Sequence, residues 1–218
     1  MPEFAVTALL FDCDGVLVDS HDAAAVAWNR WGARWCPGFD FHRDVEHGRR
    51  LADYVTELVG PARAPAAITA LMESERRYAV DVPEIRGAAA LTAGLPPGRW
   101  AVVTSGTREI ATARLAAAGI PAPAVLVTAD DVAAGKPEPD PYLLAAARLS
   151  VPPGACAVFE DAPAGVIAAR RAGAPTVIGV GTQPLPGVST MIADLRGVTF
   201  DGTHLTVGQT DTNPHQRT

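Results

Sequence analysis

An apolar run near the start of the chain ends in two closely spaced acids. Residues 9–11 are Leu-Leu-Phe, and Asp12, Cys13, Asp14 and Gly15 follow them. A buried strand does not require such an ending. In an α/β sheet the carboxyl ends of the strands open into the ligand crevice, so acids placed there meet a substrate or a metal. The run therefore predicts a first strand with a functional site at its carboxyl end.

Short apolar runs along the chain predict a parallel sheet. They are continuous rather than alternating, as expected for strands that are covered on both faces, and helical stretches lie between them. This alternation of strands and helices is typical of βαβ units in an α/β fold. The predicted strands are residues 6–11, 100–104, 125–128, 157–159 and 176–180, and the predicted helices are residues 108–118, 141–149 and 164–172.

A long segment between the first two predicted strands has helical periodicity and no convincing strand. Trp28, Trp31 and Trp35 lie at i, i+3 and i+7 within it, a spacing typical of one helix face, and we interpret this stripe as core packing rather than as a ligand site. The end of the chain is instead rich in Gly, Thr, Asp, Asn and Gln, which predicts a loosely held tail. The predicted organisation is a core of residues 1–15 and 87–200, a helical insertion of residues 16–86 and a flexible tail of residues 201–218.

The composition is typical of a globular protein in a reducing compartment. The 218 residues are 48% hydrophobic, enough for a full core and a modest inserted domain. No apolar stretch reaches the roughly 18 residues needed to cross a bilayer, and the start of the chain lacks the basic segment of a secretory signal. The net charge of −6 argues against nucleic acid as a partner. From the missing span and signal we expect a cytoplasmic protein with no membrane partner. The three cysteines are odd in number and form no metal-binding pattern, which agrees with a reducing compartment.

Asp12 and Asp14 are candidate catalytic acids. Gly15 lets the backbone turn so that both side chains point into one small volume, where two like charges need a cation or a proton between them. Mg²⁺ on Asp12 would keep that carboxylate ionised and able to attack, while Asp14 could hold a proton for a leaving oxygen. Glu160 and Asp161 end another apolar run and can supply further oxygen ligands. Asp161 could instead cap the helix near residue 164. Because Asp161 is expected at the same sheet edge as Asp12, we favour the role of metal ligand.

Donors for a phosphate group occur at two places. Thr104, Ser105 and Gly106 follow the second predicted strand and offer hydroxyls and backbone N–H groups at a helix N-terminus. Ser105 is the first candidate, because Thr104 and Thr107 could cap the helix instead. Lys136 is the only lysine among eighteen basic residues. This bias predicts a position that needs a compact ammonium group, which in phosphoryl transfer offsets the charge on the transferring group.

These segments resemble the four motifs of the haloacid dehalogenase superfamily, in the same order. The motifs are residues 11–15, 104–107, 135–137 and 160–161, and the resemblance covers about residues 9–180. It implies a Rossmann-like, doubly wound parallel sheet, an α-helical cap inserted after the first motif, Mg²⁺, and a covalent phosphoaspartate on Asp12. It also implies that Asp14 gives its backbone carbonyl to the metal and serves first as acid and then as base.

Longer strings are similar to the branch of glycerol-phosphate, deoxyglucose-phosphate and hexitol-phosphate phosphatases. In the cap, residues 47–50 resemble the same branch, which implies that His47 and Arg50 face the substrate, although an arginine on a cap helix commonly lies on a solvated face. The branch usually has threonine where this chain has Val16, so a hydroxyl contact is lost there. We therefore expect a Mg²⁺-dependent phosphatase of small polyol or sugar monophosphates, active as a monomer or weak homodimer. The similar strings are residues 100–108, 128–132, 135–142 and 159–165.

Other members of the superfamily are alternatives. A sugar-phosphate mutase of the β-phosphoglucomutase type shares the core motifs, but that branch usually has a histidine where alignment on Trp28 places Ala24. Dehalogenases work without metal or the second acid, so Asp14, Glu160 and Asp161 would be idle in one. The phosphonate-cleaving branch needs a cap lysine, and residues 16–86 contain none. A non-catalytic protein would show degraded catalytic positions, and the chain shows none.

Overall fold

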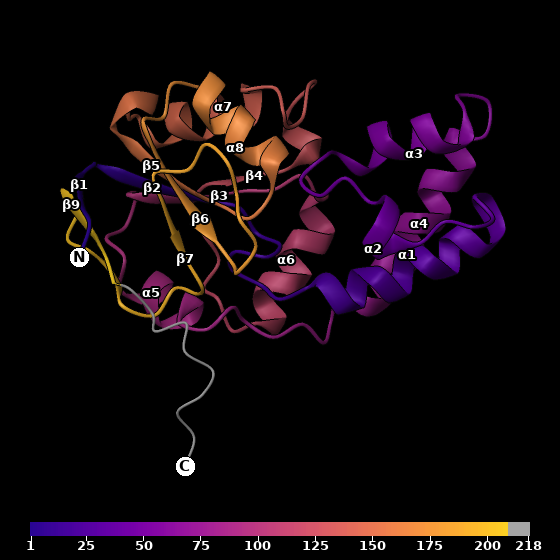
Figure 1. Ribbon diagram of the computed structural model, residues 1–218, viewed down its shortest axis with the longest axis horizontal. Helices are drawn as coiled ribbons and strands as arrows, with labels where there is room; N and C mark the ends of the chain where they lie inside the picture. The colour runs from indigo at the N-terminus through magenta and orange to yellow at the C-terminus, as the bar shows by residue number, and fades with distance from the viewer. Residues whose placement is uncertain (209–218) are drawn as a thin grey trace, which may run out of the picture.

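Parallel strands form the central sheet of the computed structural model, which describes residues 1–208 (Figure 1). The six strands have the order β4-β3-β2-β5-β6-β7, and every neighbouring pair is parallel. The predicted parallel α/β sheet is thus confirmed. The last strand in this order was not predicted, because only one of its three residues is buried. The strands are β2 (Ala8–Phe11), β3 (Trp100–Val103), β4 (Leu126–Val127), β5 (Cys156–Glu160), β6 (Thr176–Val180) and β7 (Thr190–Ile192).

Helices cover both faces of this sheet, as its continuous apolar strands require. Figure 1 shows α7 and α8 on one face and α5 and α6 on the other. In β2, Leu9 and Phe11 belong to the hydrophobic cluster that includes Leu115 of α6, whereas Leu10 packs in the cluster that includes Tyr142 of α7. The covering helices are α5 (Ala88–Gly94), α6 (Arg108–Ala117), α7 (Asp140–Leu149) and α8 (Pro163–Arg171), with short 3-10 helices at η1 (Ala129–Asp131) and η2 (Pro153–Ala155).

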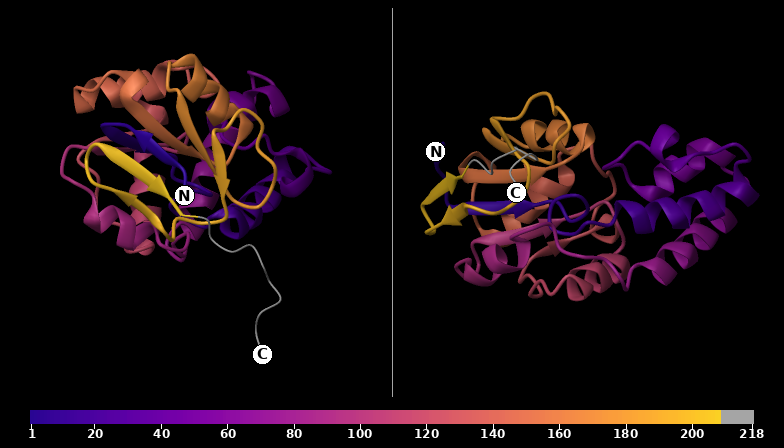
Figure 2. Two further views of the ribbon diagram at one scale, coloured as in Figure 1. Left: turned by 60° about the vertical axis from the view of Figure 1, so that its left-hand side comes forward. Right: turned by 60° about the horizontal axis from the view of Figure 1, so that its bottom comes forward.

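A helical cap is inserted between β2 and β3, as predicted. It consists of α1 (His21–Trp35), α2 (Phe41–Asp44), α3 (Leu51–Val59) and α4 (Ala64–Tyr78). The cap has its own core, in which Trp28 and Trp31 pack with Val55 and Leu71. Trp31 Nε1 donates to the carbonyl of Ala67 at 2.9 Å. This part of the tryptophan stripe therefore joins α1 to α3 and α4, and the cap lies at one end of the core sheet (Figures 1 and 2).

A small antiparallel sheet lies at the opposite end of the core (Figure 2). Its order is β1-β9-β8, with β1 (Glu3–Ala5), β8 (Val198–Phe200) and β9 (His204–Val207). The prediction of a loose tail is therefore wrong for residues 204–207, because Leu205 and Val207 are buried in the core. Two buried side chains in a polar segment are too weak a pattern to be recognised in the sequence. The remaining predicted tail, residues 209–218, lies outside the described residues.

The structure adds one observation on membranes. Among residues 1–208, none of the helices combines the length and the apolar character that a membrane span requires.

Candidate active site

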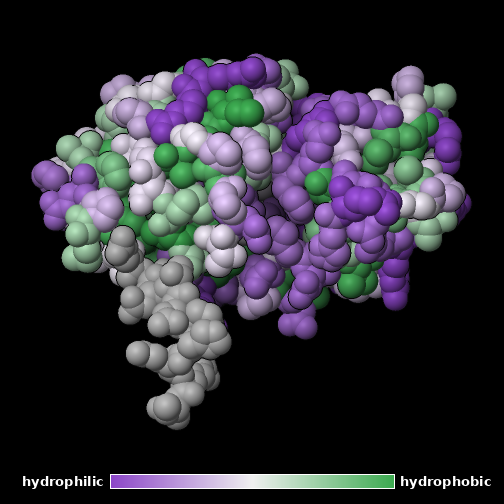
Figure 3. Space-filling view, in the orientation of Figure 1, coloured by the Kyte–Doolittle hydropathy of each residue, from purple (hydrophilic) through white to green (hydrophobic). Residues whose placement is uncertain are grey.

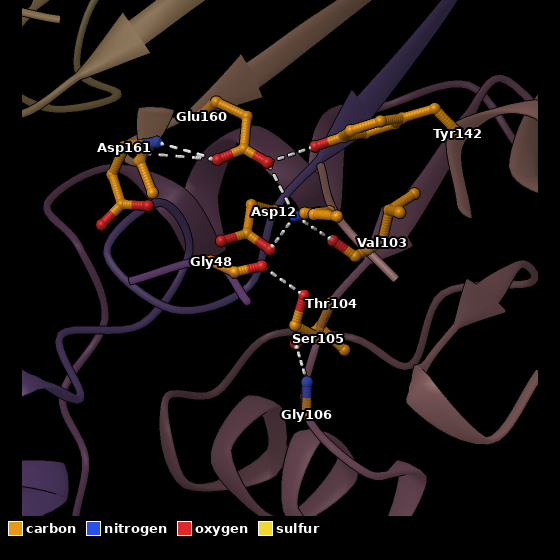
Figure 4. Close-up of polar contacts among 11 residues, drawn as sticks. Asp12, Gly48, Val103, Thr104, Ser105, Gly106, Tyr142, Glu160 and Asp161 are labelled. Atoms are coloured by element: carbon orange, nitrogen blue, oxygen red, sulfur yellow. Dashed lines mark hydrogen bonds and ion pairs between the residues drawn. The ribbon is translucent and has the colours of Figure 1, made fainter. Parts of the chain in front are cut away.

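The carboxyl ends of three neighbouring strands bring the predicted acids together. Phe11 of β2 pairs with Phe159 of β5 and with Val102 of β3. Since the strands are parallel and in this register, Asp12 lies between Glu160 on one side and the end of β3 on the other (Figure 4). The backbone N–H of Asp12 donates to the carbonyl of Phe159 at 2.9 Å. The fixed sheet edge thus sets the position of the Asp12 carboxylate.

Lys136 joins these strands at their ends. Its Nζ donates to Asp12 Oδ1 at 2.7 Å, to Glu160 Oε1 at 2.6 Å and to the carbonyl of Val103 at 3.1 Å. The side chain is fully buried. Burial alone would lower the pKa of Lys136, but the two carboxylates raise it above its usual value. A buried ammonium is stable only with such partners, so Lys136 remains charged and neutralises part of the acidic cluster.

Both carboxylate oxygens of Glu160 are already engaged. Oε1 accepts from Lys136 and from the hydroxyl of Tyr142, and Oε2 accepts from the backbone N–H groups of Asp161 and Ala162 at 3.2 and 3.5 Å. A Cβ atom at Gly165 would overlap this carboxylate, so a glycine is needed for α8 to approach so closely. Glu160 therefore acts here chiefly as the partner that holds Lys136.

Asp12 and Asp161 have oxygens available for a metal ion. Within residues 1–208, no hydrogen bond reaches Asp12 Oδ2 or the Asp161 carboxylate, and these acids, with Glu160, offer ligand atoms within 4.8 Å of one another. Burial and the neighbouring carboxylates raise the pKa of Asp12 to about 7 and hold that of Asp161 well above its usual value. Ala162 is the N-cap residue of α8, and its N–H donates to Glu160 rather than to Asp161, so Asp161 is not the cap. Clustered oxygens with uncompensated charge fit a hard cation such as Mg²⁺.

Asp14, the second acid of the first motif, bonds a partner that was not predicted from the sequence. Asp14 Oδ1 accepts a hydrogen bond from Ser20 Oγ at 2.5 Å and another from Arg114 NH1, in α6, at 2.8 Å. Arg114 NH2 lies 3.8 Å from Glu75 Oε1, in α4 of the cap. Arg114 and Glu75 are both buried. A charged residue on the inner side of the helix after β3 was the only available signal, and arginines are too frequent in this chain for it to stand out.

The loop after β3 places its polar groups beside the cap. Thr104 Oγ1 accepts from the backbone N–H of Gly106 at 3.0 Å, and Ser105 Oγ donates to the carbonyl of Gly48 at 2.6 Å (Figure 4). Thr107 is the N-cap of α6 and accepts from the N–H of Ile110 at 3.5 Å. Of the two threonines that could have been caps, Thr107 has that role. The Ser105 hydroxyl instead bridges core and cap.

The acids and this loop open into a cavity of about 300 Å³ between core and cap. Figure 3 shows mainly hydrophilic residues along the junction of the two parts. The floor comes from the core and the roof from the cap. The core residues of the lining include Asp12, Asp14, Thr104, Ser105, Gly106, Arg114 and Asp161, and those of the cap include Ala24, Trp28, His47, Arg50, Met72 and Glu75.

The two predicted cap residues differ in how they meet this cavity. The ring of His47 lies 5.1 Å from that of His21, and burial together with the neighbouring histidines lowers the pKa of His47. Arg50 lines the cavity but is engaged elsewhere: NH1 donates to the carbonyls of Val132 and Ala133 at 3.2 and 3.0 Å, and NH2 donates to Asp53 at 2.9 Å. Arg50 thus ties the cap to the core loop that precedes Lys136.

Comparisons with known proteins agree with this geometry. Hexitol phosphatase A of Escherichia coli strain K12 is 41% identical over 172 residues, which cover 75% of this chain and 78% of that protein. Glycerol-1-phosphate phosphohydrolase 2 of Saccharomyces cerevisiae is 37% identical over 191 residues, with 81% and 75% covered. The crystal structure of a hydrolase from Pseudomonas syringae superposes with a TM-score of 0.76 at 26% identity, over 86% of this chain and 94% of its own. The family model of haloacid dehalogenase-like hydrolases matches residues 6–173, and the chain belongs to that family.

Proposed function

We propose that this protein is a Mg²⁺-dependent phosphatase that hydrolyses small polyol or sugar monophosphates through a phosphoaspartate on Asp12. The observation that carries this proposal is the convergence of Asp12 and Asp161 at the floor of one cavity, with Asp14 on its wall and the buried Lys136 bonded to Asp12. An uncovered carboxylate oxygen, a fixed cation and a second acid in one site are the groups that phosphoryl transfer requires.

Asp12 and Asp14 carry out the two chemical steps. Oδ2 of Asp12 attacks phosphorus, the bond from phosphorus to the alcohol oxygen breaks, and Asp14 gives its proton to that oxygen. Asp14, now a carboxylate, then takes a proton from a water molecule as its oxygen attacks the phosphorus of the phosphoaspartate. This attack releases inorganic phosphate, restores the Asp12 carboxylate and leaves Asp14 protonated for the next cycle.

Other groups bind and orient the phosphate. Thr104, Ser105 and Gly106 line the cavity and are proposed to bind the phosphate oxygens. On binding, the Ser105 hydroxyl would exchange the carbonyl of Gly48 for a phosphate oxygen, and the Gly106 N–H would exchange Thr104 Oγ1 for another. The ammonium of Lys136 holds Asp12 Oδ1, which leaves Oδ2 directed for attack. Asp12, Asp161 and the carbonyl of Asp14 would hold Mg²⁺, while Glu160 serves by holding Lys136. The ion would supply positive charge that stabilises the transferring phosphoryl group.

The cavity and the relatives support a small alcohol as the leaving group. A volume of about 300 Å³ must hold both the phosphate and the alcohol, and His47 from the cap lines it. Two relatives named as hexitol and glycerol-1-phosphate phosphatases cover three quarters or more of this chain. Ala24, which lines the cavity, stands where the mutase branch usually has a histidine, and this difference favours hydrolysis over the mutase alternative.

Purified wild type and Asp12→Asn test the proposal. Phosphate release is measured with glycerol, hexitol, hexose and deoxyhexose phosphates, with and without Mg²⁺, and isomerisation of hexose phosphates is followed in parallel. We expect Mg²⁺-dependent phosphate release by the wild type and a loss of at least about 1000-fold in Asp12→Asn, because the nucleophile is gone. Circular dichroism checks that the variant is folded. Comparable turnover by folded Asp12→Asn would contradict the proposed nucleophile, and isomerisation faster than release would favour the mutase.

A further inference from the structure

We propose that Arg114 is a positioning residue that couples the orientation of Asp14 to closure of the cap. Arg114 lies in α6 of the core, and its guanidinium contacts an acid from each side of the cavity. NH1 donates to Asp14 Oδ1 at 2.8 Å, and NH2 lies 3.8 Å from Glu75 Oε1 in cap helix α4. The proposal rests on the function proposed above, in which Asp14 is the acid and base.

The contacts continue into the core of the cap. Trp28 Nε1, in α1, donates to Glu75 Oε1 at 2.9 Å, so the same carboxylate oxygen meets both the indole and the guanidinium. Trp28 in turn packs on Phe39 and Trp31. A connected series of polar contacts therefore runs from Asp14 through Arg114 and Glu75 to the packed interior of the cap.

Burial makes these contacts mutually dependent. Arg114 is 5% exposed and Glu75 7%, and within residues 1–208 no acceptor reaches Arg114 Nε. Burial opposes the charge on Arg114, but Asp14 and Glu75 keep the pKa of its guanidinium above the usual value. A buried charge that loses a partner is destabilised. Movement of α4 away from the core would separate Glu75 from Arg114, leaving Asp14 as the only carboxylate that compensates the guanidinium.

It follows that the closed cap and the oriented Asp14 stabilise each other, because any such coupling is reciprocal. When α4 is in place, the guanidinium is fixed between two acids and holds Asp14 Oδ1 at the cavity wall. When α4 moves away, the guanidinium loses one anchor, and Asp14 Oδ1 is then held by the hydrogen bond from Ser20 Oγ and by a less constrained Arg114. Asp14 would then be ready for proton transfer only while the cap excludes bulk water.

The chain offers a matched control on the same pair of helices. Arg76 of α4 also bonds across to α6, through Glu109 at 2.5 and 2.8 Å, but this ion pair is more than half exposed and does not reach Asp14. Arg114→Gln, Glu75→Gln and Arg76→Gln therefore each remove a charged contact between α4 and α6. Only the first two disturb the contacts that lead to Asp14.

Steady-state kinetics with a polyol monophosphate distinguish the variants. We expect Arg114→Gln to lower kcat about 100-fold, a typical share of general acid–base catalysis, with KM changed less than about threefold, since the phosphate contacts remain. Glu75→Gln should lower kcat about 10-fold, because Arg114 then loses one of its two anchors. Arg76→Gln should stay within about twofold of the wild type, because an exposed pair contributes little.

The Asp14→Asn variant serves as a second background for Arg114→Gln. It separates an effect on the position of Asp14 from a general disturbance of the active site. If Arg114 acts through Asp14, then Arg114→Gln added to Asp14→Asn should lower kcat by no more than about twofold further. With p-nitrophenyl phosphate, whose leaving group needs little protonation, Arg114→Gln should show a burst of nitrophenol followed by slow turnover. The burst appears because attack by Asp12 is preserved while activation of water is not.

Hydrogen–deuterium exchange supplies a readout without activity. We expect faster exchange across α4, residues 64–78, in Arg114→Gln and Glu75→Gln than in Arg76→Gln, because the first two weaken cap closure. This comparison remains decisive if Arg114→Gln is too unstable for kinetics, since Glu75→Gln preserves the size of the side chain.

Three outcomes would overturn the coupling. The first is an unchanged kcat in Arg114→Gln. The second is a double variant, Arg114→Gln with Asp14→Asn, in which kcat falls about 100-fold below that of Asp14→Asn alone. The third is equal hydrogen–deuterium exchange of α4 in Glu75→Gln and Arg76→Gln. An inactive wild type with all phosphate esters would instead refute the proposed function, and the exchange experiment would still decide whether Arg114 and Glu75 hold the cap.

Discussion

The cluster around Lys136 shows how single residues create the chemistry of this site. The ammonium lies between Asp12 and Glu160, both buried, and Tyr142 donates to the same Glu160 oxygen. Each of these charges would be costly alone in the interior. Together they leave Asp12 with one bonded oxygen and one that is open to the cavity. We therefore expect a single residue change here to affect both stability and the proposed reactivity.

Replacing Lys136 by Met should therefore destabilise the fold as well as abolish activity. The substitution leaves the carboxylates of Asp12 and Glu160 buried without their cation, and we expect a loss of about 3–5 kcal/mol in the free energy of unfolding. Urea unfolding measures it. Adding Glu160→Gln removes one uncompensated charge and should restore part of that loss, without restoring activity. An unchanged unfolding free energy in Lys136→Met would show that the buried ion pairs do not stabilise this core.

At the level of elements, Asp131 joins the segments on the edge of the sheet next to β4. Its carboxylate lies at the end of η1 and bonds Arg108 of α6 at 2.7 Å, Arg148 of α7 at 2.9 Å, and the N–H and hydroxyl of Thr128 at 2.9 and 2.8 Å. Burial alone would raise the pKa of Asp131, but the bonds from Arg148 and Thr128, with the charge of Arg108, lower it to about 2. One side chain thus connects helices from both faces of the sheet.

The stability contributed by Asp131 should depend on pH in a defined window. The pKa in the folded protein, about 2, lies below the ordinary 3.8, so the contribution is present above pH 3.8 and disappears as the pH falls through about 2. We expect Asp131→Asn to lower the free energy of unfolding by about 1–2 kcal/mol at pH 7 and by much less near pH 2. Urea unfolding at both values measures this. Glu138→Gln, which removes a half-exposed pair with Arg171, is the control, and a deficit equal at both values would contradict the assignment.

Over the whole molecule, the cap and core enclose the cavity while the carboxyl ends of the core strands supply its clustered acids. Ser105 bonds Gly48, Arg50 bonds the loop before Lys136, and Arg114 meets Glu75. All these contacts join sequence positions that are far apart. A ligand or ion that binds in the cavity between cap and core should therefore stabilise the entire fold rather than one element.

Binding of Mg²⁺ should be visible as such a stabilisation. At a concentration 100 times its dissociation constant, an ion that binds only the folded state adds about 2.7 kcal/mol, which for a protein of this size raises Tm by roughly 5–10 °C. Asp161→Asn should lose most of this rise, whereas Asp14→Asn should keep it, because its proposed ligand is the backbone carbonyl. Scanning calorimetry with and without Mg²⁺ tests both, and an equal rise in Asp161→Asn would exclude that carboxylate as a ligand.

The sequence by itself determined the parallel sheet, the helical insertion and the carboxyl edge at which Asp12 and Asp161 meet, whereas Lys136 was predicted for this site from its rarity and from the family resemblance. These features follow from local patterns: continuous apolar runs form strands buried on both faces, and charged residues directly after such runs must lie at the strand ends. Short or weakly patterned elements, among them β7 and β9, were not predicted, because they bury only one or two side chains each.

Only the tertiary structure decided how the charged side chains pair. It directed Glu160 to Lys136 and Tyr142, engaged Arg50 with the core, and brought Arg114 and Glu75, which are far apart in the sequence, beside Asp14. The physical reason is that an ion pair depends on which faces of two packed helices meet, and this is set by the packing of all layers together. Local sequence can place a charge on a strand end or a helix, but only the assembled fold supplies its partner.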